Sequence, residues 1–300
     1  MDNLRGAALM VMAMFGFAIE DMLIKFMAGA LPVGQILAML GVGGALVFGT
    51  IVRFQGQRLA EPAMLAPPIL IRAAGEIFGT VCFVTAIVVT PLSSASAILQ
   101  ATPLVVTLGA ALFLSEPVGW RRWSAIFVGF FGVLLIVRPG MEGFSPLSLF
   151  AVGGVLGLAI RDIATRKASV QVTTMQLSYL GFLAVIPAGV FLMIFSGTPP
   201  VALSPRIALI FAATISIGVF AYYAIVAAMR VGEVSFVTPF RYTRMIFALI
   251  IGITVFSESP DMPTLIGAAI IVASGIYTVF RERKNRAPSA ASLSKPGVPR

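Results

Sequence analysis

The chain has 300 residues, of which 59% are hydrophobic and only 11% are charged, and its mean hydropathy is +1.01. No soluble fold can bury so large an apolar fraction, because even large domains leave much of their chain exposed to water; the composition therefore indicates a lipid bilayer as solvent. The net charge is +9, histidine is absent, and Cys82 is the single cysteine. The sequence thus lacks the commonest metal ligand and acid–base catalyst, has no disulfide, and predicts neither a metal site nor a cofactor.

Apolar segments of about 20 residues recur along the chain between short turns, which is typical of transmembrane helices. The first segment is longer than the apolar core of a signal peptide, about 7–15 residues, so we expect it to be retained. An all-α membrane protein of ten helices is predicted, with helices at residues 4–28, 33–53, 68–90, 92–114, 120–138, 146–167, 174–195, 204–230, 232–256 and 262–281. Residues 283–300, which are basic and rich in Pro and Ser, predict a disordered cytoplasmic tail.

With ten crossings both termini lie on one side of the membrane, and basic residues are unequally divided between the two sides. The opposite side has three, Lys25, Arg138 and Arg206. The side of the termini has fifteen: Arg5, Arg53, Arg58, Arg72, Arg121, Arg122, Arg166, Lys167, Arg230, Arg281, Arg283, Lys284, Arg286, Lys295 and Arg300. Because cytoplasmic loops carry the excess of Lys and Arg, we expect both termini in the cytoplasm of a bacterial-type inner membrane. The positive charge then reflects topology and anionic headgroups, and does not require nucleic acid.

The second half of the chain repeats the first at a nearly constant offset. An offset of 141 aligns six pairs: Gly16 with Gly157, Ala18 with Ala159, Ile19 with Ile160, Asp21 with Asp162, Lys25 with Arg166, and Gln35 with Gln176. An offset of 142 aligns "LFLSEP" (112–117) with "TVFSESP" (254–260), and Glu116 with Glu258. The repeats, 1–140 and 141–282, hold five helices each. Because five is odd, the second copy enters from the opposite face, and such an inverted repeat predicts a transporter that opens alternately to each side.

Ten helices in a 5+5 inverted repeat, a Glu-Pro-type signature after the fourth and ninth helices, and basic cytoplasmic ends resemble the drug/metabolite transporter superfamily, EamA branch. The resemblance covers nearly the whole chain apart from the tail. Within the branch the chain is most similar to YddG-type exporters of aromatic amino acids. The resemblance implies a central cavity lined by helices 1, 3, 4, 6, 8 and 9, with helices 2 and 7 as gates and helices 5 and 10 at the periphery.

Ionisable residues near the centre of a membrane helix cost about 2.5–3.5 kcal/mol each, so every one requires a partner or a cavity. Three pairs have i, i+4 spacing and predict ion pairs on one helix face: Asp21 with Lys25, Asp162 with Arg166, and Arg72 with Glu76. Glu20 and Arg161 align with each other in the repeat and have no evident partner on their own helices. We interpret the three pairs as structural, and Glu20 and Arg161 as candidates for substrate binding or coupling.

Two helices carry polar stripes at equivalent places of the repeat. One stripe is Ser93, Ser96, Gln100, Pro103 and Thr107; the other is Ser235, Thr238, Tyr242 and Met245, with Arg241 beside it. Small polar residues also join helices together, but Gln100 and Tyr242 are too large for close packing, so the stripes favour the lining of one wet cavity. Pro103 and Pro239 interrupt the helical hydrogen bonds, and the freed carbonyls can bind a substrate ammonium.

Arg241 and Arg244 have no acidic neighbour in their own helix. They predict either a bidentate site for a substrate carboxylate or side chains that extend to the cytoplasmic surface. Five aromatic residues are candidates for an apolar cavity wall: Phe17, Phe78, Phe83, Tyr179 and Tyr223. The spacings Gly75-x-x-x-Gly79 and Gly153-x-x-x-Gly157 predict close helix contacts.

Three functions compete. The first is an exporter of small zwitterions, most simply aromatic or neutral amino acids, where the family resemblance supplies the substrate and the direction. The second is a carrier of anionic metabolites such as sugar phosphates or nucleotide sugars, which would use Arg161, Arg241 and Arg244. The third, a membrane-embedded enzyme, is disfavoured because paired carboxylates are limited to Glu20 and Asp21 and histidine is absent. Proton coupling and the oligomeric state stay open, and a monomer is compatible with the sequence.

Overall fold

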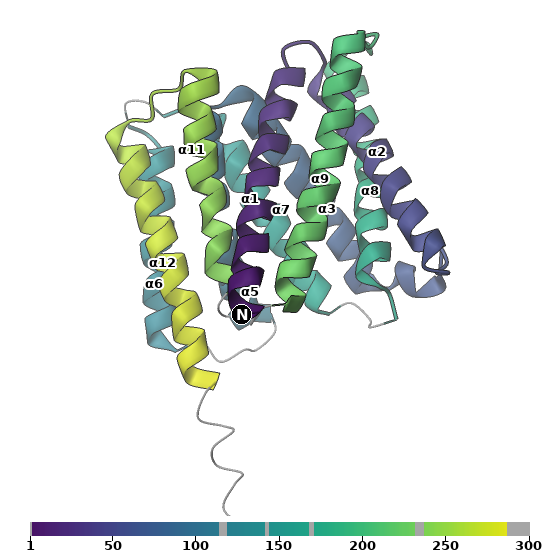
Figure 1. Ribbon diagram of the computed structural model, residues 1–300. Helices are drawn as coiled ribbons and strands as arrows, with labels where there is room; N and C mark the ends of the chain where they lie inside the picture. Colours follow the sequence, from purple (N-terminus) through teal and green to yellow (C-terminus); the bar gives the residue numbers. More distant parts are fainter. Residues whose placement is uncertain (1, 114–118, 142–143, 168–170, 232–236, 287–300) are drawn as a thin grey trace, which may run out of the picture.

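The computed structural model describes residues 2–113, 119–141, 144–167, 171–231 and 237–286, and within these ranges the chain forms helices and no strand (Figure 1). The elements are α1 (Asp2–Met27), α2 (Val33–Phe54), η1 (Pro62–Leu65), α3 (Pro67–Val89), α4 (Leu92–Leu99), α5 (Thr102–Phe113), α6 (Trp120–Val137), α7 (Ser148–Arg166), α8 (Thr174–Ser196), α9 (Pro205–Val231), η2 (Thr238–Tyr242), α11 (Thr243–Phe256) and α12 (Met262–Arg286). The predicted helices 92–114 and 232–256 are each divided in two, and the predicted tail begins inside α12.

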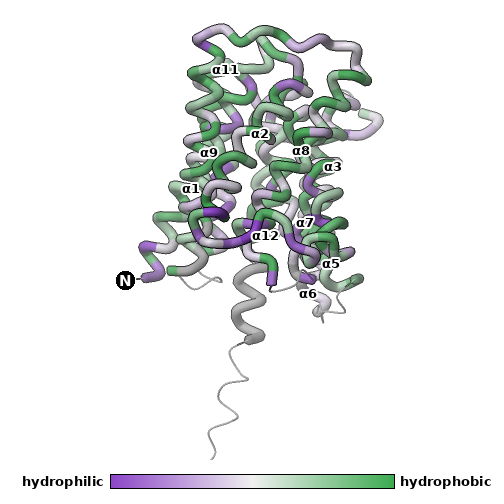
Figure 2. The backbone as a smooth tube through the Cα atoms, turned by 90° about the vertical axis from the view of Figure 1, so that its right-hand side faces the viewer, coloured by the Kyte–Doolittle hydropathy of each residue, from purple (hydrophilic) through white to green (hydrophobic). Residues whose placement is uncertain are grey.

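Eight segments of the described chain are long and apolar enough to cross a membrane, and two further apolar helices, Trp123–Val137 and Met262–Tyr277, are shorter. Figure 2 shows a chain that is largely hydrophobic along the helices, with hydrophilic residues at the two ends of the bundle and at a few places between them. The N-terminus and the end of α12 lie at the same end of the bundle (Figure 1). The protein is therefore a multi-pass membrane protein.

The two divided helices contact each other at their breaks. α4 ends at Leu99, and the amides of Gln100 and Ala101 bond to carbonyls only three residues back. Pro103, which has no N–H to donate, lies in the first turn of α5. The side-chain amide of Gln100 donates a 3.2 Å hydrogen bond to the carbonyl of Arg241, within η2. The sequence predicted both interruptions from proline, and the tertiary structure joins them.

Each half of the chain packs against the other through four extensive helix pairs: α1 with α9, α2 with α8, α3 with α7, and α6 with α12. Glycine makes the α3–α7 contact possible, because a Cβ on Gly157 would lie only 2.4 Å from the backbone nitrogen and Cα of Gly79. The predicted contact through Gly75 and Gly79 is therefore present, since Gly75 approaches the same turn of α7.

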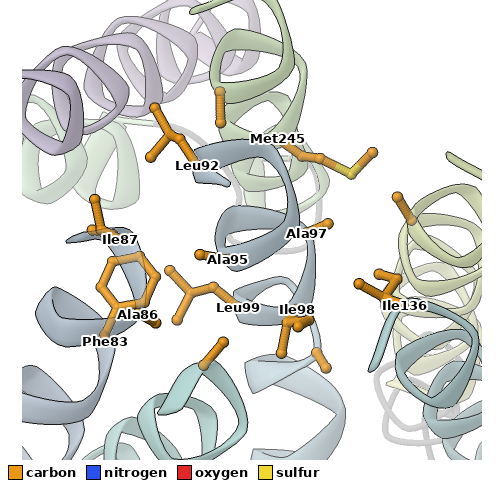
Figure 3. Close-up of a cluster of buried hydrophobic side chains, with 14 of the residues drawn as sticks. Phe83, Ala86, Ile87, Leu92, Ala95, Ala97, Ile98, Leu99, Ile136 and Met245 are labelled. Atoms are coloured by element: carbon orange, nitrogen blue, oxygen red, sulfur yellow. The ribbon is translucent and has the colours of Figure 1, made fainter. Parts of the chain in front are cut away.

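Helix α4 lies in the middle of the largest buried cluster (Figure 3). All of its residues except Ser94 are buried, and they pack against side chains of α3, α7 and α11, among them Phe83, Ile87 and Met245. A short helix that is buried on every side needs its polar backbone ends satisfied by other parts of the protein. At the N-terminal end of α4 this requirement is met by the carboxylate of Glu258, from the loop before α12.

Candidate functional site

Asp21 on α1 and Arg244 on α11 form a bidentate ion pair inside the bundle. Nη2 of Arg244 lies 2.9 Å from Oδ1 and 2.7 Å from Oδ2 of Asp21, and Nε lies 3.2 Å from Oδ2. The guanidinium carbon is 5.3 Å from the ring centroid of Phe17 and 5.5 Å from that of Phe83, distances at which an aromatic face stabilises a cation. The predicted pairing of Asp21 with Lys25 is therefore wrong. Asp21 thus occupies the Nε and Nη2 side of the Arg244 guanidinium.

Glu20 lies next to this ion pair but has no hydrogen bond or ion pair within the described residues. Its carboxylate faces α9, where Oε1 and Oε2 lie 2.7 and 3.2 Å from the position that a Cβ on Gly218 would occupy. Asp21 and Arg244 are its electrostatic neighbours. We call Glu20, Asp21 and Arg244 the α1 cluster; with both carboxylates ionised its net charge is 1 − 2 = −1.

A second cluster lies between α3 and α7, and we call its residues, Arg72, Glu76, Arg161 and Asp162, the α7 cluster. Nη1 of Arg161 is 3.2 Å from Oε1 of Glu76, and Nη2 is 2.8 Å from Oδ1 of Asp162. The predicted pair of Arg72 with Glu76 is present at 3.5 Å. Arg161 is therefore not the unpaired group that the sequence suggested, because it pairs both with Glu76 of α3 and with the adjacent Asp162 of its own helix. The side chain of Arg166 lies outside the described residues, so its pairing with Asp162 stays a prediction.

Glu258 and Lys25 cap the buried helix α4 at the end of the bundle opposite the N-terminus. Oε1 of Glu258 accepts from the Leu92 amide at 2.6 Å and from Nζ of Lys25 at 3.2 Å; Oε2 accepts from the amide and hydroxyl of Ser93 at 3.0 and 2.7 Å. Lys25 also donates to the carbonyl of Thr90 at 2.7 Å. We call these five residues the α4 cap. It connects α1, the turn between α3 and α4, and the loop before α12.

The α4 cap favours the ionised carboxylate. Burial raises the pKa of Glu258, but the hydrogen bonds from Ser93 and Leu92 and the charge of Lys25 outweigh burial and leave the pKa below its usual value. An anion at a helix N-terminus is also stabilised by the helix dipole. Lys25, predicted to neutralise Asp21, instead neutralises a residue 233 positions away in the chain.

Most polar-stripe residues that the structure describes are buried, and Ser235 lies outside the described residues. Ser96 and Tyr242 are buried, and their hydroxyls have no hydrogen-bond partner among the described residues. The hydroxyl of Tyr242 packs against Gly275 of α12. Gln100 is buried, whereas Pro103 and Thr238 are half-buried. Arg241 is exposed, yet it lies within electrostatic range of Arg161 and Asp162 on α7 and of Arg244 on α11.

The five aromatic candidates are not brought together. Phe17 and Phe83 both approach Arg244. Tyr179 is half-buried and approaches Gly49 of α2, and Phe78 and Tyr223 are 51% and 68% exposed. Two of the five candidates therefore belong to the surroundings of the α1 cluster.

Sequence reasoning missed two features. It identified Glu258 only as part of the repeated motif, although Lys25, one of three basic residues on the predicted outer side, was a signal for its partner. It gave no role to Gly218, because a single glycine in an apolar helix has many explanations. No group of three or more His, Cys, Asp or Glu that could hold a metal occurs in the part of the chain that the structure describes.

Charge clusters between the helices of a multi-pass bundle are typical of substrate or ion pathways across a membrane. The model of the EamA-like transporter family matches residues 4–138 and again residues 146–280, so the chain belongs to this family.

Relatives in the family have different named substrates. The chain is 24% identical over 282 residues to the S-adenosylmethionine uptake transporter of Rickettsia prowazekii, covering 94% of this chain and 95% of the relative. It is 27% identical over 274 residues to the pseudopaline exporter CntI of Pseudomonas aeruginosa, covering 90% and 94%. It is 30% identical over 197 residues to the riboflavin transporter of Vibrio cholerae, covering 65% of each chain. A crystal structure at 19% identity superposes with a TM-score of 0.61 over 93% of this chain and 98% of that chain, which indicates a shared fold.

Proposed function

We propose that this protein exports small zwitterionic metabolites of the amino-acid type by alternating access between two inverted five-helix repeats, residues 1–140 and 141–282, with both termini in the cytoplasm. Two observations support the repeat. The family model matches each half separately. The pairing of helices also has the symmetry of the repeat, in which α1, α2, α3 and α6 correspond to α7, α8, α9 and α12. Exchanging the two halves converts the α1–α9 pair into the α3–α7 pair and leaves the α2–α8 and α6–α12 pairs unchanged.

We infer the substrate class from the carboxylate of Glu20, which has no ion-pair partner among the described residues. At the equivalent place of the other repeat, Arg161 is bound by Glu76, whereas the residue at offset 142 from Glu76 is Gly218, which offers Glu20 no charge. A cation is therefore missing from the α1 cluster, and a substrate ammonium would supply it. The exposed Arg241, in electrostatic range of both clusters, provides a group for the substrate carboxylate.

The charges favour a zwitterion over an anionic metabolite. A carrier of sugar phosphates would need several free basic groups, but Arg161 and Arg244 are both held by carboxylates. Among the three arginines considered for an anion, only Arg241 lacks an acidic partner within the described residues. Among the described residues, the free cation of Arg241 and the free carboxylate of Glu20 match an amino acid. The family resemblance adds aromatic or neutral side chains and the direction of export.

Alternating access requires that contacts at each end of the bundle form and break. The α4 cap joins α1 to the loop before α12 at the end opposite the N-terminus, and we infer that it holds this end closed. Opening would separate Lys25 from Glu258 and leave the amides of Leu92 and Ser93 to water.

The test is flux into proteoliposomes that contain the purified chain, with labelled phenylalanine, threonine, S-adenosylmethionine and a sugar phosphate in parallel, each with and without a pH gradient. We expect saturable flux of the amino acids and at least a tenfold loss with Glu20→Gln, while the control Asp2→Asn, at the exposed start of α1, keeps wild-type flux. Flux of the sugar phosphate alone would contradict the zwitterion assignment. Flux of phenylalanine that follows the pH gradient would assign a proton, in addition to the substrate, to Glu20.

A further inference from the structure

A groove opens on the outer surface of the bundle where α6 and α12 separate. The two helices are in close contact at Gly132, where an added Cβ would lie 2.7 Å from the carbonyl oxygen of Gly267. Toward the end that carries the N-terminus they enclose a groove of about 240 Å³, lined by α6 residues between Trp120 and Val128 and by Ser274 and Tyr277 of α12. No residue of the α1 cluster or the α7 cluster lines this groove.

The groove is lined by apolar, aromatic and basic side chains. Ala125 and Val128 supply apolar surface. Trp120 and Tyr277 are 72% and 46% exposed, and such residues are enriched where membrane proteins meet lipid headgroups. The guanidinium carbon of Arg121 lies 5.3 Å from the ring centroid of Trp120, so the cation is held beside the groove rather than free in solution.

The sequence at this end of the two helices is rich in basic residues. Arg121 lines the groove. The sequence also holds Arg122 and, from 281 to 286, four basic residues and one acidic residue, whose side chains lie outside the described residues. The first turn of α6 contains no acidic residue. Basic pockets between membrane helices attract anionic lipid headgroups, and an apolar groove below the headgroup fits part of an acyl chain.

We propose that this groove binds one anionic phospholipid, with its phosphate beside Arg121 and an acyl chain against Ala125 and Val128. The lipid would occupy the space that the separating helices leave open and would stabilise the α6–α12 pair. This assignment is independent of the transported substrate, because it depends only on the outer surface of the bundle.

The experiment compares the purified full chain in detergent with added phosphatidylglycerol, phosphatidylcholine or inorganic phosphate, and measures retained lipid by native mass spectrometry and the melting temperature. Arg121→Gln removes the charge, and Val128→Phe fills the groove at a position that is 51% exposed, so the variant is expected to fold. Arg53→Gln, an exposed arginine at the end of α2, is the matched control for charge.

We expect one retained phosphatidylglycerol and a larger rise in melting temperature than with phosphatidylcholine. Arg121→Gln should lower retention about fivefold, the factor that corresponds to about 1 kcal/mol for one cation near an anionic headgroup. Val128→Phe should abolish the preference, while Arg53→Gln keeps it. Equal binding of phosphatidylcholine, equal stabilisation by inorganic phosphate, or an equal loss with Arg53→Gln would each overturn the proposal.

Discussion

Replacing Glu258 by glutamine tests whether the α4 cap acts as a gate. The substitution keeps the shape of the side chain but removes the charge that four donors share: the amides of Leu92 and Ser93, the Ser93 hydroxyl and the ammonium of Lys25. The side chains of Lys25 and Glu258 are 16% and 9% exposed, so water replaces the lost contacts only in part.

The size of the effect follows from these contacts. A hydrogen bond to a charged group contributes about 1.5–3 kcal/mol, and removal of one partner of a buried ion pair costs about 3–5 kcal/mol. Glutamine retains one acceptor oxygen, so we expect a loss of about 3 kcal/mol from the conformation that contains the cap. If the cap is broken in the open conformation, this loss shifts the equilibrium toward opening about a hundredfold.

A cysteine at Ser96 reports the opening, because Ser96 is fully buried in α4 about one turn from Ser93. The only native cysteine, Cys82, is replaced by alanine, and Ser96→Cys is labelled with a membrane-impermeant maleimide. Glu258→Gln should accelerate labelling at least tenfold. The control Asp261→Asn breaks the more exposed ion pair with Arg138 in the same loop, so labelling should stay unchanged.

A lower melting temperature with unchanged labelling in Glu258→Gln would refute the reasoning. That result would mean that the α4 cap is present in both conformations and contributes only to stability. Faster labelling in Asp261→Asn as well would mean that any destabilisation of this loop exposes α4, which would also contradict a specific role for the cap.

Three further predictions follow from the same contacts. Gly157→Ala should prevent formation of the folded protein, because the new Cβ would overlap the backbone of α3. Gly119→Ala should be tolerated, because a Cβ at that position has nothing within 4 Å. The yield and melting temperature of the two variants test this difference. Asp21→Asn should destabilise by about 3–5 kcal/mol because it leaves the half-buried guanidinium of Arg244 without its carboxylate. Asp21→Asn with Arg244→Leu should recover most of this loss in thermal unfolding. A double variant as unstable as the single one would contradict the pair. The pKa of Glu258 is lowered in the folded protein, so its ionised carboxylate contributes to stability in full above its unfolded pKa of about 4.5. This contribution to stability is lost as pH falls through the lower folded pKa. The melting temperature should therefore fall less steeply below about pH 4.5 in Glu258→Gln than in the wild type.

The amino-acid sequence determined the class of fold because hydrophobicity acts over whole segments. Runs of about 20 apolar residues can satisfy their backbone groups in a bilayer only as helices, so the helix positions followed from composition and length. Proline marked the interruptions before α5 and in η2, because it lacks an N–H wherever it occurs. Glycine spacing marked the α3–α7 contact for a similarly local reason.

Only the tertiary structure decided which charges meet. The i, i+4 rule describes neighbours on one helix face, and it was right for Arg72 with Glu76. It was wrong for Asp21, because Arg244 approaches from α11 with a geometry that a longer, bidentate guanidinium satisfies better than Lys25. An ion pair between helices depends on their packing and rotation, which the sequence of either helix does not contain. For the same reason, only the tertiary structure shows that Gly218 of α9, rather than a cation, lies against the carboxylate of Glu20.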